Sequence, residues 1–324
     1  MRSFLTSLVV LLGGIGCANC ASVEAGDDAM AWLGKIATAS RQINYSGTFV
    51  YQHGRQIETS RIAHWADPSG EYEKLETLDG PPREFIRNND NVTCYLPESK
   101  TVVIEKRTAR QFPALLPEQL TGISDNYIVK KGELDRVAGF DCQVIVLESR
   151  DNLRYGHKFC ADLASGLPLR ARTYSEKNEM IESFAFTQLT IGNSVTKDML
   201  KSRYAGKSQT WRVDKSALEK SESFADSGWM LKPQPAGFKK LTEMTRSIAG
   251  RAARVSHIVY SDGLAAVSVF IEPMPTPPPP AGPTYQGAIN IYVKSQADQM
   301  VTVVGEAPAR TIKQIAESLG PKTR

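Results

Sequence analysis

The stretch FDCQVIVLESRDNLRYGHKFCAD, residues 140–162, decides the fold class of this chain. Two strand-like runs, 140–148 and 154–162, flank a short polar segment that has the composition of a turn. Two more runs follow at 167–174 and 180–189, each after residues that favour turns. The stretch therefore predicts four strands in chain order, paired as an antiparallel meander.

The two cysteines of this stretch are predicted to form a disulfide. If the first loop has an odd number of residues and is centred on Asp151, Cys142 lies directly opposite Cys160. Directly opposed residues have Cα atoms about 4.5 to 5.5 Å apart, a separation that a disulfide accepts. A two-residue turn at Asp151-Asn152 would miss this pairing by one residue. Cys94 is expected to be unpaired, and three buried free thiols are the alternative.

The N-terminus has the order of a secretory signal peptide, predicted over residues 1–22. Met1-Arg2 precede an uncharged, mostly apolar run at 3–16, and small residues follow it. The apolar run is too short to span a bilayer. In the alternative, a lipoprotein, Cys17 would be acylated, although Gly14 stands where an aliphatic residue is usual. Secretion implies an oxidising compartment, in which disulfides form.

Length and composition predict two packed domains. The chain has 324 residues, of which 41% are hydrophobic and 23% charged, ordinary values for a packed soluble protein. The strand-like period fades after about Leu200, so we expect a first domain at 24–205, a linker at 206–227 and a second domain at 228–324. The net charge of +4 is spread along the chain, which gives only a weak attraction to anionic surfaces. A nucleic-acid partner is not expected for a secreted protein.

The first domain is predicted to hold one large, curved antiparallel sheet. A helix capped by Asp27-Asp28 is expected to run to about Ser40 and to pack on the sheet through its apolar face. From Tyr45 to His53 the hydrophobic period changes to two. Further short runs separated by turn residues follow at 57–65, 70–78, 85–88, 92–96 and 101–106. Residues 112–120 interrupt the series and are predicted as a short helix over the sheet.

The second domain is predicted as a smaller antiparallel sheet with a closing helix. Its pattern gives a hairpin of 257–261 and 264–271 around Asp262-Gly263, then strands at 288–293 and 300–304, then a helix at 309–319. A proline-rich excursion at 273–283 separates the hairpin from the later strands. Pro275 to Pro280 could serve as a polyproline ligand, but a stiff spacer between two strands is the interpretation we favour.

The sequence contains no recognisable catalytic constellation. It has no G-x-S-x-G elbow, no H-E-x-x-H, no P-loop and no glycine-rich dinucleotide turn after a strand. The four histidines, His53, His64, His157 and His257, fall on separate predicted strands without the spacing of metal ligands. One arrangement would favour a metal, with His53 and His64 as cross-strand neighbours around Gly54. We expect ordinary polar strand positions instead, and neither catalysis, metal nor cofactor.

An ordered set of segments across the chain resembles the RseB/MucB family. In the first domain the resemblance rests on NYSGTFVY (44–51), RDNLRYG (150–156), SGLPLR (165–170) and MIESFAF (180–186). In the second domain it rests on PAGF (235–238), YSDGL (260–264), and VTVVGE (301–306) followed by Pro308 and the closing helix. None of these segments is specific alone, but together they span nearly the whole mature chain.

The resemblance implies a bacterial periplasmic regulator of the sigma-E envelope-stress response. Members of the family bind the periplasmic part of an RseA/MucA-type anti-sigma factor and shield it from site-1 proteolysis. The first domain of the family resembles the lipoprotein carriers LolA and LppX, an unclosed antiparallel β-barrel with packed helices and an apolar concavity. A lipid or lipopolysaccharide signal is thought to release the anti-sigma factor. This sequence departs from the family pattern at 273–283 and at Cys160, a position that the family need not share.

The predicted strands carry apolar residues on both faces, so the curved sheet must cover both faces or leave one for a ligand. Our candidates for the lining of a lipid cavity are Phe49, Tyr51, Phe184 and Phe186. In the alternative, core side chains and the short helix near Leu115-Leu116 fill the concavity. A lipid or lipoprotein carrier without a regulatory partner is the alternative function. An envelope hydrolase would need a nucleophile and a base that the sequence does not offer.

Overall fold

The computed structural model describes residues 21–106, 115–117, 120–215, 223–224, 226–247, 254–296 and 298–322. Residues 1–20 of the predicted signal peptide and most of the predicted helix at 112–120 lie outside these ranges. Of that helix, Leu115 to Pro117 and Leu120 are described and are not helical. Within the described residues, no helix has the length and apolar character to cross a bilayer.

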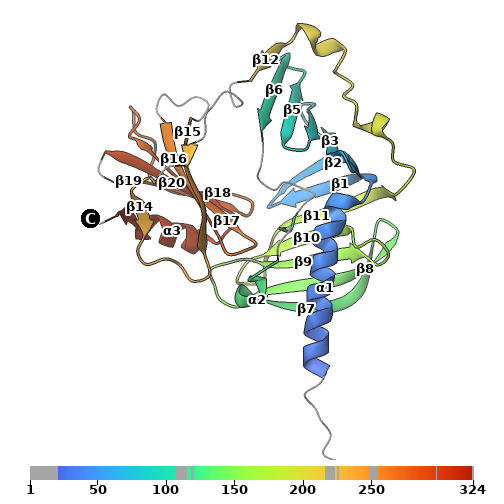
Figure 1. Ribbon diagram of the computed structural model, residues 1–324, viewed down its shortest axis with the longest axis horizontal. Helices are drawn as coiled ribbons and strands as arrows, with labels where there is room; N and C mark the ends of the chain where they lie inside the picture. The colour runs from blue at the N-terminus through green and yellow to red at the C-terminus, as the bar shows by residue number, and fades with distance from the viewer. Residues whose placement is uncertain are drawn as a thin grey trace, which may run out of the picture.

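The first module is a single twelve-stranded sheet, in the order β12-β6-β5-β4-β3-β2-β1-β11-β10-β9-β8-β7 (Figure 1). Its strands are β1 (Tyr45–His53), β2 (Gln56–Asp67), β3 (Gly70–Thr77), β4 (Glu84–Asn88), β5 (Asn91–Leu96), β6 (Thr101–Lys106), β7 (Tyr127–Val137), β8 (Phe140–Ser149), β9 (Gly156–Asp162), β10 (Pro168–Tyr174), β11 (Met180–Ile191) and β12 (Arg212–Asp214). Every pair is antiparallel except β12 with β6. Because β12 and β7 end the order without pairing to each other, the sheet is unclosed. The predicted fold class is confirmed.

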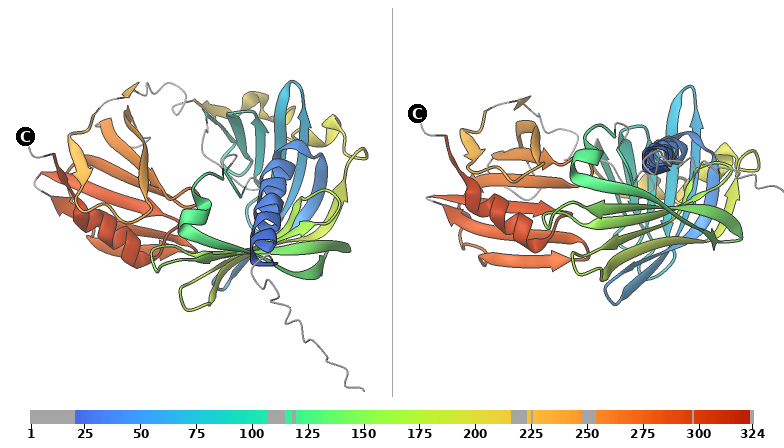
Figure 2. Two further views of the ribbon diagram at one scale, coloured as in Figure 1. Left: turned by 60° about the horizontal axis from the view of Figure 1, so that its bottom comes forward. Right: turned by 90° about the horizontal axis from the view of Figure 1, so that it is seen from below.

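The long helix α1 (Ala21–Gln42) packs against β7, β8, β10 and β2, and the sheet curves around it (Figure 2). Its apolar face, with Leu33 and Ile36, forms a core with Ile145, Leu147 and Phe159 of the sheet. The predicted cap at Asp27-Asp28 is wrong, because the helix begins at Ala21. Asp28 instead forms an ion pair of 2.6 Å with the Lys131 side chain of β7.

Strand β7 was missed by the sequence prediction. Five of its eleven residues are charged, and it forms one edge of the sheet, where both of its faces meet solvent over most of its length. The pairing with β8 shifts register between Lys131 and Leu134. Charged side chains and an irregular register are typical of an edge strand that avoids pairing with other chains.

The β8–β9 hairpin pairs in a register other than the predicted one. Cys142 lies opposite Asp162, and Cys160 lies opposite Val144, so the loop is centred one residue later than Asp151. The side chain of Asp151 accepts a hydrogen bond from the backbone N–H of Leu153 at 2.9 Å, which extends the turn before β9 begins. Cys142 and Cys160 nevertheless form a disulfide, from diagonal positions with Cα atoms 5.4 Å apart.

The second module is a seven-stranded sheet in the order β13-β15-β16-β17-β20-β19-β18. Its strands are β13 (Ser223–Phe224), β15 (Lys239–Ser247), β16 (Arg254–Ser261), β17 (Ala266–Pro273), β18 (Gly282–Gln286), β19 (Ile289–Gln296) and β20 (Gln299–Gly305). Helix α3 (Ala309–Ser318) packs on β19 and β20, and β14 (Trp229–Leu231) pairs with β21 (Leu319–Pro321). Ile312 and Ile315 of α3 join the buried core of this sheet. The closing helix lies where the period of 3.6 predicted it, whereas β15 and β18 were not predicted.

The segment between the modules contributes to both sheets. Two short 3-10 helices, η1 (Lys197–Leu200) and η2 (Lys207–Thr210), lead to β12, which pairs with β6 of the first sheet. Residues 212–214, which we assigned to the linker, thus lie in the first module. The edge strand β13 pairs with β15 of the second sheet. The residues between β12 and β13 lie outside the described ranges except Lys215.

Candidate functional site

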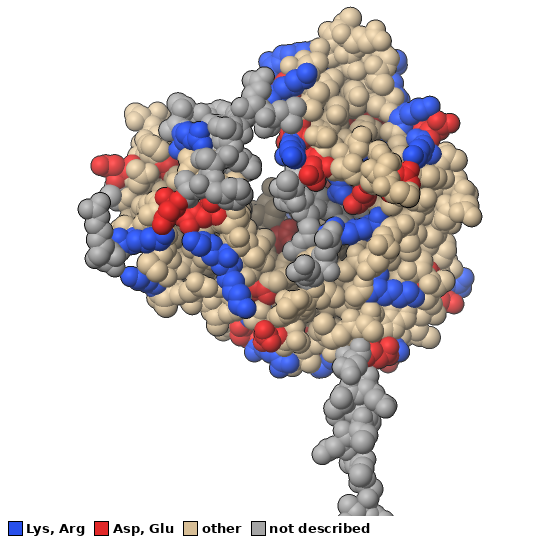
Figure 3. Space-filling view, in the orientation of Figure 1, with Lys and Arg blue, Asp and Glu red and all other residues tan. Residues whose placement is uncertain are grey.

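A cavity of about 370 Å³ opens on the inner face of the first sheet, where the second module meets it. In the space-filling view the surface is hollowed between the two modules (Figure 3). Strands β1, β2, β3, β9, β10 and β11 supply most of the lining, together with Leu115. The second module adds Leu264, Ala265, Ile289 and Glu306. The cavity is therefore a composite of both modules.

Aromatic residues of β1 and β11 form the apolar end of the cavity. Phe49 pairs with Phe186 and Tyr51 with Phe184 across the two strands, so all four side chains project from the same face of the sheet. The ring centroids of Phe49 and Phe184 lie 5.2 Å apart in an edge-to-face arrangement. Phe49, Tyr51 and Phe184 line the cavity. Phe186 does not line it, because it packs deeper against Tyr45.

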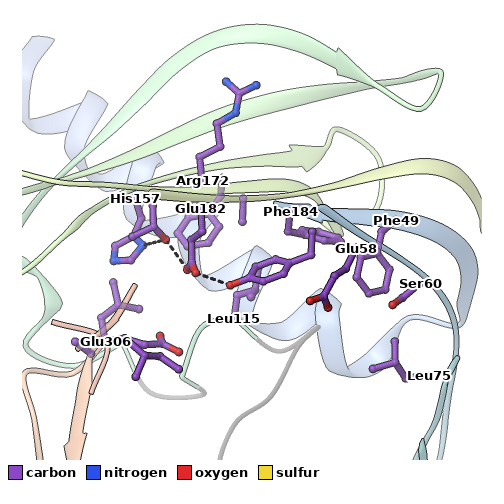
Figure 4. Close-up of a pocket in the computed structure, with 17 residues that line it drawn as sticks. Phe49, Glu58, Ser60, Leu75, Leu115, His157, Arg172, Glu182, Phe184 and Glu306 are labelled. Carbon is purple, nitrogen blue, oxygen red and sulfur yellow. Dashed lines mark hydrogen bonds between the residues drawn. The ribbon is translucent and has the colours of Figure 1, made fainter. Parts of the chain in front are cut away.

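Hydroxyl and carboxylate groups form the other end (Figure 4). The Tyr51 hydroxyl donates a hydrogen bond of 2.6 Å to Glu182 Oε2, and the Thr173 hydroxyl donates one of 3.1 Å to Glu182 Oε1. The same Thr173 oxygen lies 3.4 Å from Nδ1 of His157. Glu306 of the second module also lines the cavity, and Glu58 lies beside Phe49 and Phe184 (Figure 4).

Burial and nearby carboxylates determine the protonation states of Tyr51 and His157 in the cavity. Burial raises the pKa of Tyr51 far above its usual value, and the hydrogen bond to Glu182 and the charges of Glu182, Glu306 and Glu58 raise it further. Burial also lowers the pKa of His157 to about 4, so its imidazole is neutral at pH 7. The guanidinium of Arg172 points away from the cavity (Figure 4). The Tyr51 hydroxyl and the His157 imidazole are thus both uncharged at pH 7.

Core side chains fill part of the concavity, as the alternative prediction proposed. Among the described residues the filling element is α1, and Leu116 packs into the same core as Leu33 and Ile145. Leu115 reaches the boundary between that core and the cavity. The filled part and the open part of the concavity therefore lie side by side.

A buried ion pair joins the two modules beside this cavity. Arg154, just before β9, donates from Nε to Oδ2 of Asp262 in the β16–β17 turn at 2.7 Å, and the two side chains are 1% and 0% exposed. Tyr127 donates its hydroxyl to the same Asp262 oxygen at 3.1 Å. Arg154 also donates from Nη2 to the carbonyl oxygen of Ala236 at 2.8 Å, and its guanidinium lies over the ring of Phe238. One arginine therefore contacts two separate loops of the second module.

Neutral contacts extend this junction. The side-chain amide of Asn290 donates to the Tyr155 hydroxyl at 2.8 Å, and the Thr311 hydroxyl donates to the Leu153 carbonyl at 2.8 Å. Gly237 has φ +79, and a Cβ there would lie 2.6 Å from Nη2 of Arg154. Only glycine allows this approach without displacing the arginine. The segments 150–156, 235–238 and 260–264, which carried the family resemblance, thus meet at one interface, although sequence reasoning had not placed them together.

The histidines do not assemble into a metal site. His53 lies opposite Gln56 and His64 opposite Tyr45, so they occupy opposite ends of the β1–β2 pair, not neighbouring positions around Gly54. His64 Nδ1 lies 2.8 Å from the Ile43 carbonyl and its Nε2 lies 3.3 Å from Glu71. No group of three or more His, Cys, Asp or Glu is arranged to hold a metal ion in the parts of the chain that the structure describes.

An unclosed antiparallel sheet with an apolar hollow, fixed by a buried ion pair to a second sheet with its own helix, defines a two-module β protein suited to binding. The particular family is clear from comparison with known proteins. The chain belongs to the MucB/RseB family: the MucB/RseB N-terminal domain matches residues 28–204 and the MucB/RseB C-terminal domain matches residues 223–320.

Named relatives support this assignment. The sigma factor AlgU regulatory protein MucB of Pseudomonas aeruginosa is 33% identical over 328 residues and matches 98% of each chain. The sigma-E factor regulatory protein RseB of Escherichia coli K12 is 24% identical over 292 residues, covering 89% of each chain. The complex structure of Pseudomonas aeruginosa MucA/MucB has a TM-score of 0.71 at 28% identity, over 92% of this chain and 100% of that chain. The crystal structure of MucB in complex with MucA(peri) gives the same values.

Proposed function

We propose that this chain is a periplasmic negative regulator of a sigma-E-type envelope-stress response. In this role it binds the periplasmic part of an RseA/MucA-type anti-sigma factor and shields it from site-1 proteolysis. The observation that carries the proposal is the likeness, over 92% of the chain, to MucB in a complex with MucA. The secretory pattern of residues 1–22 supports the periplasmic location.

Shielding requires occupancy and no chemical step. The protection of a cleavage site equals the fraction of anti-sigma factor that has the regulator bound. This fraction depends on the concentration of the regulator and on the dissociation constant of the complex. In the cavity the hydroxyls of Tyr51 and Thr173 donate to Glu182, and burial keeps the pKa of Tyr51 very high, so that its hydroxyl stays protonated. The function proposed here is therefore binding without catalysis.

The cavity supports a second element of the proposal, an amphiphilic signal. Its apolar end, with Phe49 and Phe184, can bury a hydrocarbon chain, and each buried CH₂ contributes about 0.8 kcal/mol. The alternative function, a lipid or lipoprotein carrier without a regulatory partner, draws on the same cavity. The two functions differ in whether an anti-sigma factor binds.

Protection of the anti-sigma factor is the direct test. The mature chain is mixed with the periplasmic segment of the anti-sigma factor encoded in the same genome, and cleavage by the site-1 protease is followed over time. We expect cleavage to slow in proportion to the fraction bound, which is measured separately by calorimetry. Unchanged cleavage together with absent binding would contradict the regulator and leave the carrier.

A further inference from the structure

A second pocket lies on the face of the first sheet that points away from the cavity. Phe49 and Tyr51 of β1 line the cavity, so the alternating residues Ser46 and Thr48 project from the opposite face. A groove of about 400 Å³ opens there, lined by β1, β2, β3, β11 and Met199 of the 3-10 helix η1. We call it the outer groove. It is separate from the cavity, because the two have no lining residue in common among the described residues.

Helix η1 is fixed to the sheet and forms one wall of the outer groove. Lys197, its first residue, forms an ion pair of 2.5 Å with Asp67 of β2. Just after η1, the carbonyl oxygen of Lys201 accepts a hydrogen bond of 2.9 Å from Nζ of Lys74 in β3. Met199 lies between these two attachments and is 43% exposed. The wall is therefore in place before a ligand arrives, as is usual for small-molecule sites.

The charged side chains of the outer groove already have partners of opposite charge. Arg61 and Glu76, which both line the groove, lie 3.5 Å apart, and Glu76 also contacts Arg203 of the segment that follows η1. Lys74, the third charged lining residue, lies 3.5 Å from Glu84. A charged ligand would have to compete with these pairs. The outer groove therefore favours an uncharged ligand over an ion.

Hydroxyl and amide groups are what the outer groove offers to a ligand. Ser46, Thr48 and Thr190 contribute hydroxyls and Gln188 an amide, and none of these four side chains hydrogen-bonds to another group in the described part of the chain. Strand pairing places Ser46 opposite Thr190 and Thr48 opposite Gln188, so neighbouring members of the set are about 5 to 7 Å apart. Each of these groups can both donate and accept. They suit a ligand that carries several hydroxyl groups.

The outer groove has little apolar surface for a hydrocarbon chain. Ile62 and Leu189 border it, but their side chains pack in the core on the inner face of the sheet. Ala63 and Met199 supply the apolar side chains on the groove side, and Ala63 is only 7% exposed. A sugar ring needs no more than this, since it combines hydroxyl groups at its edge with C–H groups on its faces. A lipid would leave most of its chain in water.

From the paired charges and the set of hydroxyl and amide groups, we propose that the outer groove binds a short, uncharged oligosaccharide. Its hydroxyl groups bond to Thr48, Gln188 and Thr190, and the C–H face of one ring lies against Met199. A volume of about 400 Å³, near the lower end of small-molecule sites, limits the bound part to a few sugar rings. The site is distinct from the cavity and independent of whether an anti-sigma factor or an amphiphile binds.

Three uncharged ligands test the proposal: triacetylchitotriose, maltotriose and a triserine peptide blocked at both ends. Each is titrated into the isotope-labelled full mature chain and followed by the amide signals in nuclear magnetic resonance spectra. We expect a sugar to shift the signals of 46–48 and 188–190 to saturation and to bind at least about tenfold more tightly than the peptide. Preference for chitotriose indicates a glycan of acetylated amino sugars, and preference for maltotriose a glucan. Added salt should leave the affinity within about twofold, because no ion pair forms on binding.

Variants of β11 locate the site. Gln188→Ala should weaken sugar binding about fivefold, which is the usual net contribution of one hydrogen bond, and adding Thr190→Ala should bring the loss to at least about tenfold. Gln209→Ala, at an exposed glutamine of η2 outside the groove, is the matched control and should leave the affinity unchanged. Gln188 and Thr190 are both exposed, so the variants should keep their fold, which thermal unfolding checks. If the double variant unfolds, Gln188→Ala alone decides.

Three results would overturn the proposal. Binding of the serine peptide as tight as that of either sugar would exclude the sugar class. Sugar binding that the Gln188→Ala variant leaves unchanged would exclude the location. Failure of both sugars to shift the signals of 46–48 and 188–190 up to their solubility limits would exclude the site. The anti-sigma protection assay on the same protein tests the regulator separately.

Discussion

Glu73 on β3 is a buried carboxylate whose ionisation opposes folding. Its side chain is 9% exposed, the nearest cation is Arg87 with Nη1 at 3.9 Å, and Glu73 Oε2 lacks a hydrogen-bond partner in the described structure. Burial, with a smaller effect of the Glu71 charge, raises the pKa of Glu73 from 4.5 to about 8 despite Arg87. The folded protein therefore holds a proton here at neutral pH that the unfolded chain releases.

The sign of the pH dependence follows from this difference. Between pH 4.5 and 8 the folded state binds more protons at Glu73 than the unfolded state, so the contribution of Glu73 to stability falls as pH rises through that window. We expect Glu73→Gln to abolish this fall. Relative to the parent, the free energy of unfolding of the variant should rise by about 4 kcal/mol between pH 4.5 and pH 8. Urea unfolding at the two pH values measures it, and a parallel pH dependence in both proteins would refute it.

Arg154 stabilises the contact between the two modules, because its ion-pair partner Asp262 lies in the second module. Removing the guanidinium in Arg154→Met leaves Asp262 buried without a cation, and we expect the free energy of unfolding to fall by roughly 3 to 5 kcal/mol. Adding Asp262→Asn to that variant should recover part of the loss, because the uncompensated charge is gone. A double-mutant cycle in guanidinium chloride measures the coupling; strictly additive losses would show that the pair does not act as a unit.

Residue patterns predicted which side chains share a face within one strand but not which strands meet. Strand period put Phe49 with Tyr51 on one face and Phe184 with Phe186 on one face. The pairing of β1 with β11, which brings these strands together, was not predicted. That the candidates line a lipid site stays a prediction. Arg154 and Asp262 are separated by 108 positions, and nothing in the local pattern of either distinguishes an interface from a polar turn. The clue available in the sequence was that both lie within segments that carried the family resemblance.

At the scale of elements, the β8–β9 hairpin shows that hydrophobic alternation predicts where strands lie but not the register in which they pair. Alternation located both strands to within two residues, but register depends on the turn, and the side chain of Asp151 lengthened the loop. Strand β7 escaped prediction because an edge strand needs no apolar face along its whole length. Buried strands and the amphipathic helix α3, by contrast, follow directly from hydrophobic periodicity.

The disulfide of this hairpin gives a prediction at the same scale. It closes a loop between residues 18 positions apart, and the loop-entropy account gives about 3 kcal/mol for such a crosslink. We expect reduction, or the double variant Cys142→Ser with Cys160→Ser, to lower the free energy of unfolding by that order. Peptide mapping without reductant should recover the Cys142–Cys160 pair and a Cys94 outside any disulfide. A map in which both hairpin thiols are free, or in which either is joined to Cys94, would contradict the predicted disulfide.

For the whole molecule, the connection between β12 and β13 is where we place the domain boundary. Residues before it are held to the first sheet by Arg203, which contacts Glu76 and Glu84, and by the β12–β6 pair. We expect limited proteolysis to cut first at 215–222 and to leave two folded fragments. Early cuts within 45–191 would show that the boundary lies elsewhere.

The fragments should remain together after such a cut. The Arg154–Asp262 pair and the Asn290–Tyr155 hydrogen bond join them without the linker. Size-exclusion chromatography of the nicked protein should therefore give one peak at low salt, and Arg154→Met should convert it into two. Separation of the nicked parent chain would show that the buried contacts are too weak to hold the modules.

The composite cavity links module arrangement to both proposed ligands. Since Leu264, Ile289 and Glu306 of the second module line a cavity built mainly from the first, an amphiphile in the cavity senses how the modules are placed. If the anti-sigma segment prefers another placement, each ligand must weaken the other by the same factor, because coupling free energies are reciprocal. We expect the segment to lower the affinity for an amphiphile, and the amphiphile to lower the affinity for the segment equally. Phe49→Ser or Phe184→Ser should reduce amphiphile binding more than anti-sigma binding. Calorimetric titrations of each ligand with and without the other measure the factor. Unchanged amphiphile affinity in the saturated complex would mean that the chain shields its partner without a lipid switch.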